Sequence, residues 1–354
     1  VLHLIDRISL GGAQRIVISL LNNNKKQSLD IKLQTLKKTN KKQFVKKIEN
    51  NNKFSLLKIL KLIKTINSPR YDLIHCHLSK SIIFCLLFAN KNKKIIVHEH
   101  GKILRKGLLY EFCLKIFKHK VDLFLAVSRT VKQKLISKAK IPENKIKVLY
   151  NPINLKEFSP DNKSKAEIKS EKEKLDIKDI EFVIGFVGRL SKVKGCKYLI
   201  KSLQYLDFKY KLLILGDGPE RKNLEKLSEN LEIRNNVEFL GYKESVKKYY
   251  SLSDLVVIPS LSESFGLVAL EAQAMGVPVI CSEIPAFKEI LSNKKNALFF
   301  ESQNEKDLTD KIKKIYSEEK LSKKLIRNGL ENVKNYDLET YINNLTEVYK
   351  KINV

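Results

Sequence analysis

Short apolar runs alternate with amphipathic segments along the first 150 residues of the chain. Leu2–Ile5 is an apolar run of strand length, and apolar residues then recur at helical spacing between Ala13 and Leu21. The same alternation predicts further strands at 31–36, 72–77, 95–98, 123–127 and 146–150, and helices at 54–66 and 129–139, the latter with Ser128 as its N-cap. Strands and helices that alternate in this way are typical of a parallel sheet covered on both faces.

The alternation pauses over residues 151–181, a segment with two prolines and many Lys, Glu, Asp and Ser residues. It then restarts, with strands expected at 182–187, 211–215, 237–240, 255–258 and 277–281, and helices at 196–206, 221–231, 246–252 and 267–275. We therefore predict an α/β protein with two Rossmann-like, doubly wound domains at residues 1–155 and 156–335. They would face across a cleft in which ligands bind at the carboxyl ends of the strands. A helix over 336–354 could cross back to the first domain.

The composition excludes several classes of protein. Hydrophobic residues make up 43% of the 354 residues, as in a globular protein with large cores, which excludes a wholly disordered chain. The longest apolar run, residues 82–89, is too short for a transmembrane helix. The opening segment lacks the basic start and cleavage site of an export signal, and five cysteines without a CxxC pair fit a reducing cytoplasm, so we expect a cytoplasmic protein.

The formal net charge of +29 is concentrated in the first half of the chain. Residues 1–160 hold 34 basic and 9 acidic side chains, whereas the remainder is nearly balanced. One interpretation is compositional drift in an AT-rich genome, which also explains the abundance of Lys, Asn and Ile. The other is an anionic partner, and it is favoured because only the first half lacks balancing acid. No nucleic-acid-binding motif is present, so a membrane surface or an anionic acceptor is the preferred partner.

His75 and His77 flank Cys76 in a predicted strand, where alternation puts the two histidines on one face. A metal site needs more ligands, and the sequence has no further Cys/His cluster to complete a coordination sphere. We therefore expect no bound metal.

Residues 259–272 (PSLSESFGLVALEA) place a polar loop between a predicted strand and a predicted helix. Free N–H groups and the dipole at a helix start favour an anion such as a diphosphate, and Gly266 lets the backbone approach it closely. Glu271 lies about 6 Å along the helix, where it could accept hydrogen bonds from ribose hydroxyls, and Glu263 could do the same for a sugar. A helix start with a solvated carboxylate explains either glutamate alone, but the two together favour a ligand.

Residues 188–195 (GRLSKVKG) form a second strand–loop–helix segment. Arg189 and Lys194 are the cations that could neutralise two phosphates there. The Gly-Gly pair ending at Gly12 follows the first predicted strand, and a tight turn explains it as well as phosphate contact does. One of His98 and His100 could point into the cleft, and a core or surface histidine is the alternative.

These segments together resemble glycosyltransferase family 4, whose members are retaining enzymes of the GT-B fold that use nucleotide-sugars. The resemblance covers nearly the whole chain, and its most specific motif is the pair formed by Glu263 and Glu271. It implies that Glu271 holds the ribose, Glu263 the donor sugar, and Arg189 with Lys194 the diphosphate. It places His100 near the donor sugar, and it implies donor contacts for Gly12, Tyr242, Ser264, Phe265, Gly266, Leu267 and Val268.

The same resemblance implies a function. The first domain would bind the acceptor and the second the nucleotide-sugar, and His100, Glu263, Arg189 and Lys194 would be the catalytic residues of a metal-independent hexosyl transfer with no cofactor. A UDP-sugar is the first choice of donor and GDP-mannose the second. The acceptor would be lipid-linked or a polysaccharide, at the inner face of the cytoplasmic membrane, in cell-surface glycan synthesis. The alternatives are a nucleotide-sugar epimerase, a phosphorylase, or a non-catalytic nucleotide-sugar or nucleic-acid binding protein.

Overall fold

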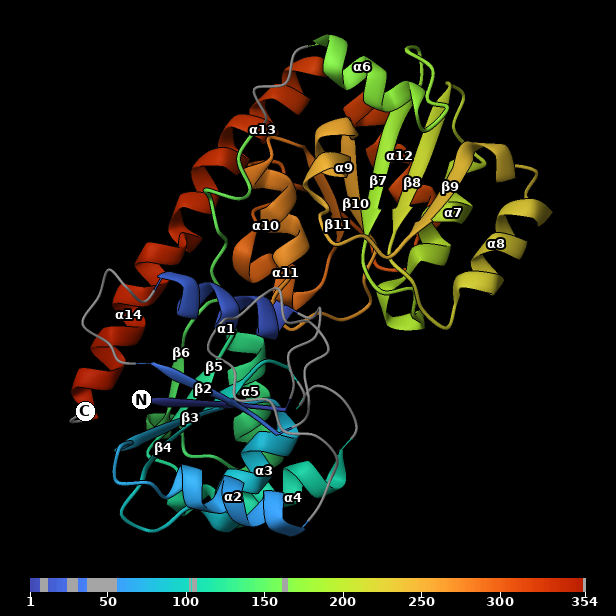
Figure 1. Ribbon diagram of the computed structural model, residues 1–354. Helices are drawn as coiled ribbons and strands as arrows, with labels where there is room; N and C mark the ends of the chain where they lie inside the picture. Colours follow the sequence, from blue (N-terminus) through green and yellow to red (C-terminus); the bar gives the residue numbers. More distant parts are fainter. Residues whose placement is uncertain are drawn as a thin grey trace. The chain divides into compact units, whose positions relative to one another are not determined.

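A computed structural model of the chain describes residues 1–6, 12–23, 31–36, 56–101, 103, 107–160 and 165–352 (Figure 1). The chain divides into two compact units. Unit 1 comprises Val1–Pro152 together with Leu338–Val354, and unit 2 comprises Ile153–Asp337. The sequence analysis placed its boundaries at 155/156 and 335/336, and the structure divides the chain at 152/153 and 337/338.

Unit 1 contains a six-stranded parallel sheet in the order β2-β1-β3-β4-β5-β6. Its strands are β1 (Leu2–Ile5), β2 (Lys32–Thr35), β3 (Leu73–His77), β4 (Lys94–Glu99), β5 (Leu123–Ala126) and β6 (Ile146–Val148). The helices are α1 (Gly12–Asn23), α2 (Leu56–Ile66), α3 (Ser79–Phe88), α4 (Leu108–Phe117), α5 (Arg129–Ala139) and α14 (Leu338–Lys351). The C-terminal α14 therefore belongs to the unit that holds the N-terminus.

Unit 2 contains the second six-stranded parallel sheet, in the order β12-β11-β10-β7-β8-β9. Its strands are β7 (Phe182–Val187), β8 (Tyr210–Leu215), β9 (Val237–Gly241), β10 (Leu255–Ile258), β11 (Val279–Ser282) and β12 (Leu298–Phe300). The helices are α6 (Lys165–Glu173), α7 (Cys196–Leu203), α8 (Arg221–Asn230), α9 (Lys247–Leu252), α10 (Leu267–Ala274), α11 (Pro285–Ile290), α12 (Glu305–Ser317) and α13 (Glu319–Val333).

The predicted α/β class with two doubly wound sheets is confirmed, because both sheets are wholly parallel and their strands are almost completely buried. Within the described residues, no helix is both long and apolar enough to span a bilayer.

Candidate donor site and histidine cluster

Three strands of unit 2, β10, β7 and β9, end in the loops that carry predicted donor residues, and β8 lies between β7 and β9. The sheet order β10-β7-β8-β9 puts the carboxyl ends of these strands side by side. Glu263 follows β10, Arg189 and Lys194 follow β7, and Tyr242 follows β9. Residues far apart in the sequence are thus collected at one edge of the sheet, which is where doubly wound proteins bind ligands.

The loops after β7 and β10 contact each other directly. The Leu261 N–H donates to the Val193 carbonyl at 2.8 Å. Gly195 has a φ of 65°, and a Cβ at that position would lie 1.8 Å from the Pro259 carbonyl oxygen, so only glycine permits this approach. The packing fixes residues 188–195 against the loop that carries Glu263.

Glu263 is held in place by two partners. Its Oε1 forms an ion pair with the Lys194 ammonium and accepts a 2.9 Å hydrogen bond from Ser260 Oγ. Ser260 is itself buried, and its carbonyl accepts a hydrogen bond from Ser282 Oγ at 2.7 Å. From the sequence, Lys194 and Glu263 are expected to hold different parts of the donor, but the structure joins them in one ion pair. A bound diphosphate would therefore share Lys194 with this carboxylate.

Glu271 lies in the first turns of α10 and is buried. The Tyr250 hydroxyl donates a 2.9 Å hydrogen bond to its Oε2. A buried carboxylate needs hydrogen bonds to remain satisfied, and Tyr250 supplies one while orienting the group. The sequence analysis did not identify Tyr250, because a tyrosine in α9 carries no motif that relates it to a glutamate 21 residues later.

The start of α10 depends on Gly266, which has a φ of 104°. A Cβ there would lie 2.6 Å from Cε1 of the fully buried Phe287. The first N–H groups of the helix, including those of Leu267 and Val268, have no partner inside the helix, so this end is suited to an anion. Ser264 is half-buried beside it.

The side chains of Phe265, Tyr242 and Arg189 differ in exposure. Phe265 is buried against the Tyr336 ring, so only its main chain could meet a ligand. Tyr242 and Arg189 are exposed. No ion pair or hydrogen bond joins the Arg189 guanidinium to any part of the chain that the structure describes. It is an uncompensated cation at the end of β7.

A turn after β8 completes this edge and was not predicted as part of the site. A Cβ added at Gly216 would lie 1.9 Å from the Gly188 carbonyl oxygen. A Cβ added at Gly218 would lie 2.2 Å from the Leu190 carbonyl oxygen. The Leu190 N–H donates to the Asp217 carbonyl at 3.0 Å. The sequence signal was the Gly-Asp-Gly triplet directly after a predicted strand.

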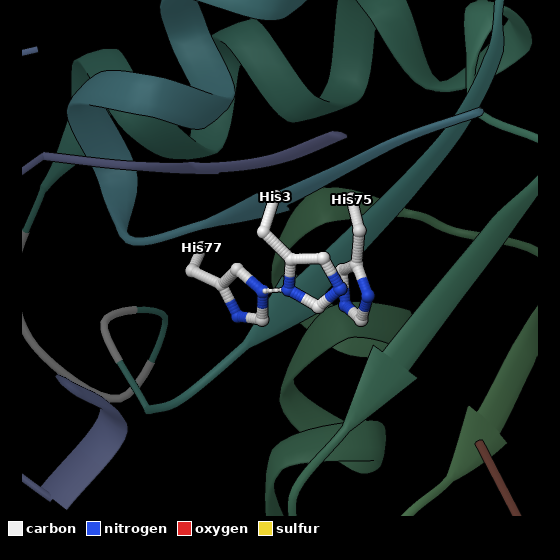
Figure 2. A group of neighbouring side chains, drawn as sticks. All are labelled: His3, His75 and His77. Atoms are coloured by element: carbon white, nitrogen blue, oxygen red, sulfur yellow. Dashed lines mark hydrogen bonds between the residues drawn. The ribbon is translucent and has the colours of Figure 1, made fainter. Parts of the chain in front are cut away.

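Unit 1 gathers five histidines on one face of its sheet: His3, His75, His77, His98 and His100. His3 is in register with His75, and His77 with His98, while the i, i+2 spacing keeps each pair on a strand on the same side. Figure 2 shows three of the rings converging from β1 and β3. The sequence shows no further Cys/His cluster that would complete a site with His75 and His77. The structure nevertheless places His3, His98 and His100 beside them, which could not be predicted because register between strands cannot be read from local sequence.

Hydrogen bonds link the five imidazoles and the Tyr349 hydroxyl into one chain. His98 Nδ1 lies 3.2 Å from His75 Nε2, and His3 Nδ1 lies 3.0 Å from His77 Nε2. The Tyr349 hydroxyl connects the two pairs, because it lies 2.7 Å from His75 Nδ1 and 2.9 Å from His3 Nε2. The last hydrogen bond of the chain joins His77 Nδ1 to His100 Nε2 at 3.1 Å.

Each neutral imidazole and each phenol hydroxyl carries one hydrogen. Every contact in the chain can therefore pair one donor with one acceptor, whichever end of the chain the donors point toward. His98 Nε2 and His100 Nδ1 are its ends, and they are the buried ring nitrogens without a partner among the described residues. Burial lowers the pKa of His3 and of His100 to about 3, and it lowers the pKa values of the other three rings well below 6.5. The five rings are therefore neutral at pH 7.

Two groups of these rings bring ligand atoms within 4.8 Å of one another: His3 with His75 and His77, and His77 with His98 and His100. Neutral imidazoles are metal ligands in principle. The hydrogen-bond chain uses eight of the ten ring nitrogens and leaves His98 Nε2 and His100 Nδ1 without a partner among the described residues.

His100 also depends on a neighbouring carboxylate. Glu99 is buried at the end of β4 and accepts hydrogen bonds from the N–H groups of Gly101, at 2.7 Å, and Ile103, and from the Tyr110 hydroxyl. These contacts fix the turn that follows His100.

Gly12, the predicted donor contact in unit 1, is the exposed first residue of α1, and its neighbour Gly11 lies outside the described residues.

Family models match both halves of the chain. The model described as Glycosyltransferase Family 4 matches residues 10–157, and the model described as Glycosyl transferases group 1 matches residues 167–332. An uncharacterized glycosyltransferase of Methanocaldococcus jannaschii is 32% identical over 311 residues, which cover 82% of this chain and 78% of the relative. The O-antigen chain mannosyltransferase RfbU of Salmonella typhimurium is 30% identical over 234 residues, which cover 64% of this chain and 61% of RfbU.

A further relative is the capsular polysaccharide biosynthesis glycosyltransferase CapM of Staphylococcus aureus, 31% identical over 219 residues, or 60% of this chain and 56% of CapM. Among solved structures, Anabaena HepE in complex with UDP and glucose superposes with a TM-score of 0.86 at 20% identity and covers 99% of both chains. The fold is thus GT-B, and the chain belongs to the glycosyltransferases of group 1 and family 4.

Proposed function

We propose that the protein transfers a hexosyl group from a UDP-sugar, with retention of configuration, to a lipid-linked or polysaccharide acceptor in cell-surface glycan synthesis. The observation that carries the proposal is the edge formed by β10, β7, β8 and β9, where Arg189 and the Lys194–Glu263 pair lie on loops that contact each other. The names of two kinds of similar protein support the proposed acceptor and the proposed donor. CapM and RfbU are named for capsule and O-antigen synthesis, and HepE binds UDP and glucose.

The diphosphate would bind between Arg189, Lys194 and the start of α10. Negative charge grows on the leaving diphosphate as the glycosidic bond breaks, and preorganised cations and helix N–H groups stabilise it. These groups lie on strand ends and a helix, so little reorganisation is needed. Transfer by this route needs no metal, and we expect a chelator to leave the rate unchanged.

Glu271 and Glu263 would bind the two sugars of the donor. Glu271 Oε2 is oriented by Tyr250, which leaves the carboxylate able to accept hydrogen bonds from ribose hydroxyls. Glu263 would hold the transferred sugar while remaining paired with Lys194. Unit 1 would supply the acceptor site, with His100 as a neutral hydrogen-bonding group near the sugar, and Gly12 as a main-chain contact.

Nucleotide release from UDP-, GDP- and ADP-sugars, with and without a bacterial lipid extract, tests the proposal. We expect release from one UDP-sugar that requires the lipid fraction, persists with a chelator, and is lost in Glu271→Ala. The matched control is Glu229→Ala on α8, an exposed glutamate away from this edge.

Three results would contradict parts of the proposal. Conversion of the donor sugar without any acceptor and without net release of the nucleotide would indicate an epimerase. A donor that raises the melting temperature but is never consumed would indicate a binding protein. Loss of activity with a chelator that returns on adding a divalent cation would exclude the metal-independent route.

A further inference from the structure

The exposed apolar side chains of unit 1 are concentrated on three helices. Thirteen large hydrophobic side chains are exposed in the described part of the protein, and eight of them lie in unit 1. All eight belong to α2, α3 or α4, with exposures between 40% and 84%. We call this set the apolar-basic face: Leu57, Leu60, Leu87, Phe88, Leu108, Leu109, Phe112 and Ile116.

The three helices are neighbours. α3 contacts α4, and the Lys120 ammonium just beyond α4 donates to the Leu86 carbonyl in α3 at 3.0 Å. Asn67, directly after α2, donates to the Phe88 carbonyl at 3.0 Å and accepts from the Asn90 N–H at 2.8 Å. Figure 1 shows α2, α3 and α4 along one side of the unit 1 sheet. The exposed set therefore lies on helices of one side of the sheet, with α3 and α4 in contact and the end of α2 bonded to the end of α3.

α4 has apolar side chains on both its inner and its outer face. Tyr110, Cys113 and Leu114 pack into the core. Leu109, Phe112 and Ile116 recur at i, i+3 and i+7 on the outside, where a helix that covers a sheet normally presents polar residues. Isolated exposed leucines need no explanation, but a contiguous apolar surface marks an interaction site.

The charges on these helices are almost all positive. Lys61, Lys64 and Lys115 are exposed, and the Lys58 side chain lies outside the described residues. Glu111 is the acidic residue within α2, α3 and α4, and it is paired with Lys138 at 3.3 Å. Two copies of this face would bring lysines against lysines, whereas an anionic surface complements them.

We propose that the apolar-basic face docks on an anionic lipid bilayer, with Leu109 and Phe112 inserted among the acyl chains and Lys61, Lys64 and Lys115 at the headgroups. Amphipathic helices that lie in a bilayer interface combine these features. The inference deepens the proposed function, since a lipid-linked acceptor requires the enzyme to reach the bilayer. Docking itself involves none of the residues assigned to the donor.

Vesicle sedimentation of the full chain tests the inference without any activity measurement. Vesicles of phosphatidylcholine alone are compared with vesicles that also contain phosphatidylglycerol, at low and high salt. We expect binding only to the anionic vesicles, with a decrease as salt increases. Equal binding to both kinds of vesicle, or none to either, would overturn the proposal.

Two variants separate the contributions. Lys61→Gln/Lys64→Gln/Lys115→Gln should weaken binding by about fivefold per lysine. Leu109→Ser/Phe112→Ser should weaken it by about tenfold or more, because two inserted apolar side chains are lost. Matched controls change exposed residues of unit 2, namely Lys295→Gln/Lys306→Gln/Lys320→Gln and Ile180→Ser, and these should bind as the unchanged protein does.

The same variants distinguish docking on a bilayer from association with a second copy of the chain. Unchanged melting temperatures establish that the variants fold, as expected for exposed positions. Vesicle binding that survives both variants would overturn the proposal, and so would a monomer–dimer equilibrium that Leu109→Ser/Phe112→Ser abolishes. The rise in melting temperature on adding the UDP-sugar without lipid reports separately on the donor site, so failure of docking and failure of donor binding give different results.

Discussion

Arg189 lies just beyond the end of β7 and is an exposed cation for which the described residues supply no counter-ion. A cation placed in advance where diphosphate charge develops lowers the barrier to transfer. Arg189→Ala should therefore lower kcat/KM for the donor by about 30- to 1000-fold, or about 2–4 kcal/mol in the barrier. Steady-state nucleotide release with the identified donor measures this change.

Arg327→Ala is the matched control, because Arg327 is exposed on α13. It should leave kcat/KM unchanged. If Arg189→Ala is as active as this control, Arg189 has no role in stabilising the leaving group, and Lys194 with the α10 N-terminus would have to act alone.

At the residue scale, the sequence singles out candidate donor residues but not their partners. Strand–loop–helix patterns and unusual residue types marked Glu263, Glu271 and Arg189 in advance. The Lys194–Glu263 pair and the Tyr250–Glu271 hydrogen bond could not be predicted, because both depend on how loops from different strands meet. The same limitation explains why the sequence suggested two histidines at a site where the structure places five.

At the scale of elements, α14 is tied to the unit 1 sheet through Tyr349. Its buried hydroxyl bonds to His75 at 2.7 Å and to His3 at 2.9 Å. Tyr349→Phe interrupts the hydrogen-bond chain and leaves buried imidazole nitrogens without partners, which should lower the free energy of unfolding by roughly 1–3 kcal/mol. Chemical denaturation followed by circular dichroism measures the loss.

Tyr341→Phe provides a control on the same helix. The Tyr341 hydroxyl is buried and has no hydrogen-bond partner within the described residues, so its removal should be neutral or slightly stabilising. Equal destabilisation by the two substitutions would mean that the histidine chain contributes nothing and that α14 is sensitive to any change.

The hydrophobic pattern predicted many of the elements, but α11, β12, α12 and α13 were not among them. Ser128 is the N-cap of α5, and its Oγ accepts from the Val131 N–H at 3.1 Å as the sequence indicated. α3 and α4 were not predicted, because apolar residues on both faces remove the helical period. α6 was missed within the expected boundary segment, since its composition is almost wholly polar.

At the scale of the whole molecule, the two units differ in how they respond to acid. All six histidines of the chain lie in unit 1, and five of them form the cluster, in which four are buried and His100 is half-buried. Burial holds the pKa values of these five below the ordinary value of 6.5, so the folded rings stay neutral while the unfolded rings become protonated below that pH. Between pH 6.5 and about 3, the unfolded state of unit 1 binds more protons than the folded state.

The stability of unit 1 should therefore be fully present above pH 7 and decrease as the pH falls below 6.5. At pH 5.5 each ring that stays neutral should lower the stability by on the order of 1 kcal/mol, and the five together by several kcal/mol, an appreciable part of the stability of a domain. Urea denaturation at pH 7.5, 6.5 and 5.5, followed by limited proteolysis to assign each transition, should show the unit 1 midpoint falling steeply. Unit 2 contains no histidine and serves as an internal control. A unit 1 midpoint that stays constant to pH 5.5 would mean that the folded cluster accepts protons as readily as the unfolded chain, and the neutral hydrogen-bond chain would then be wrong.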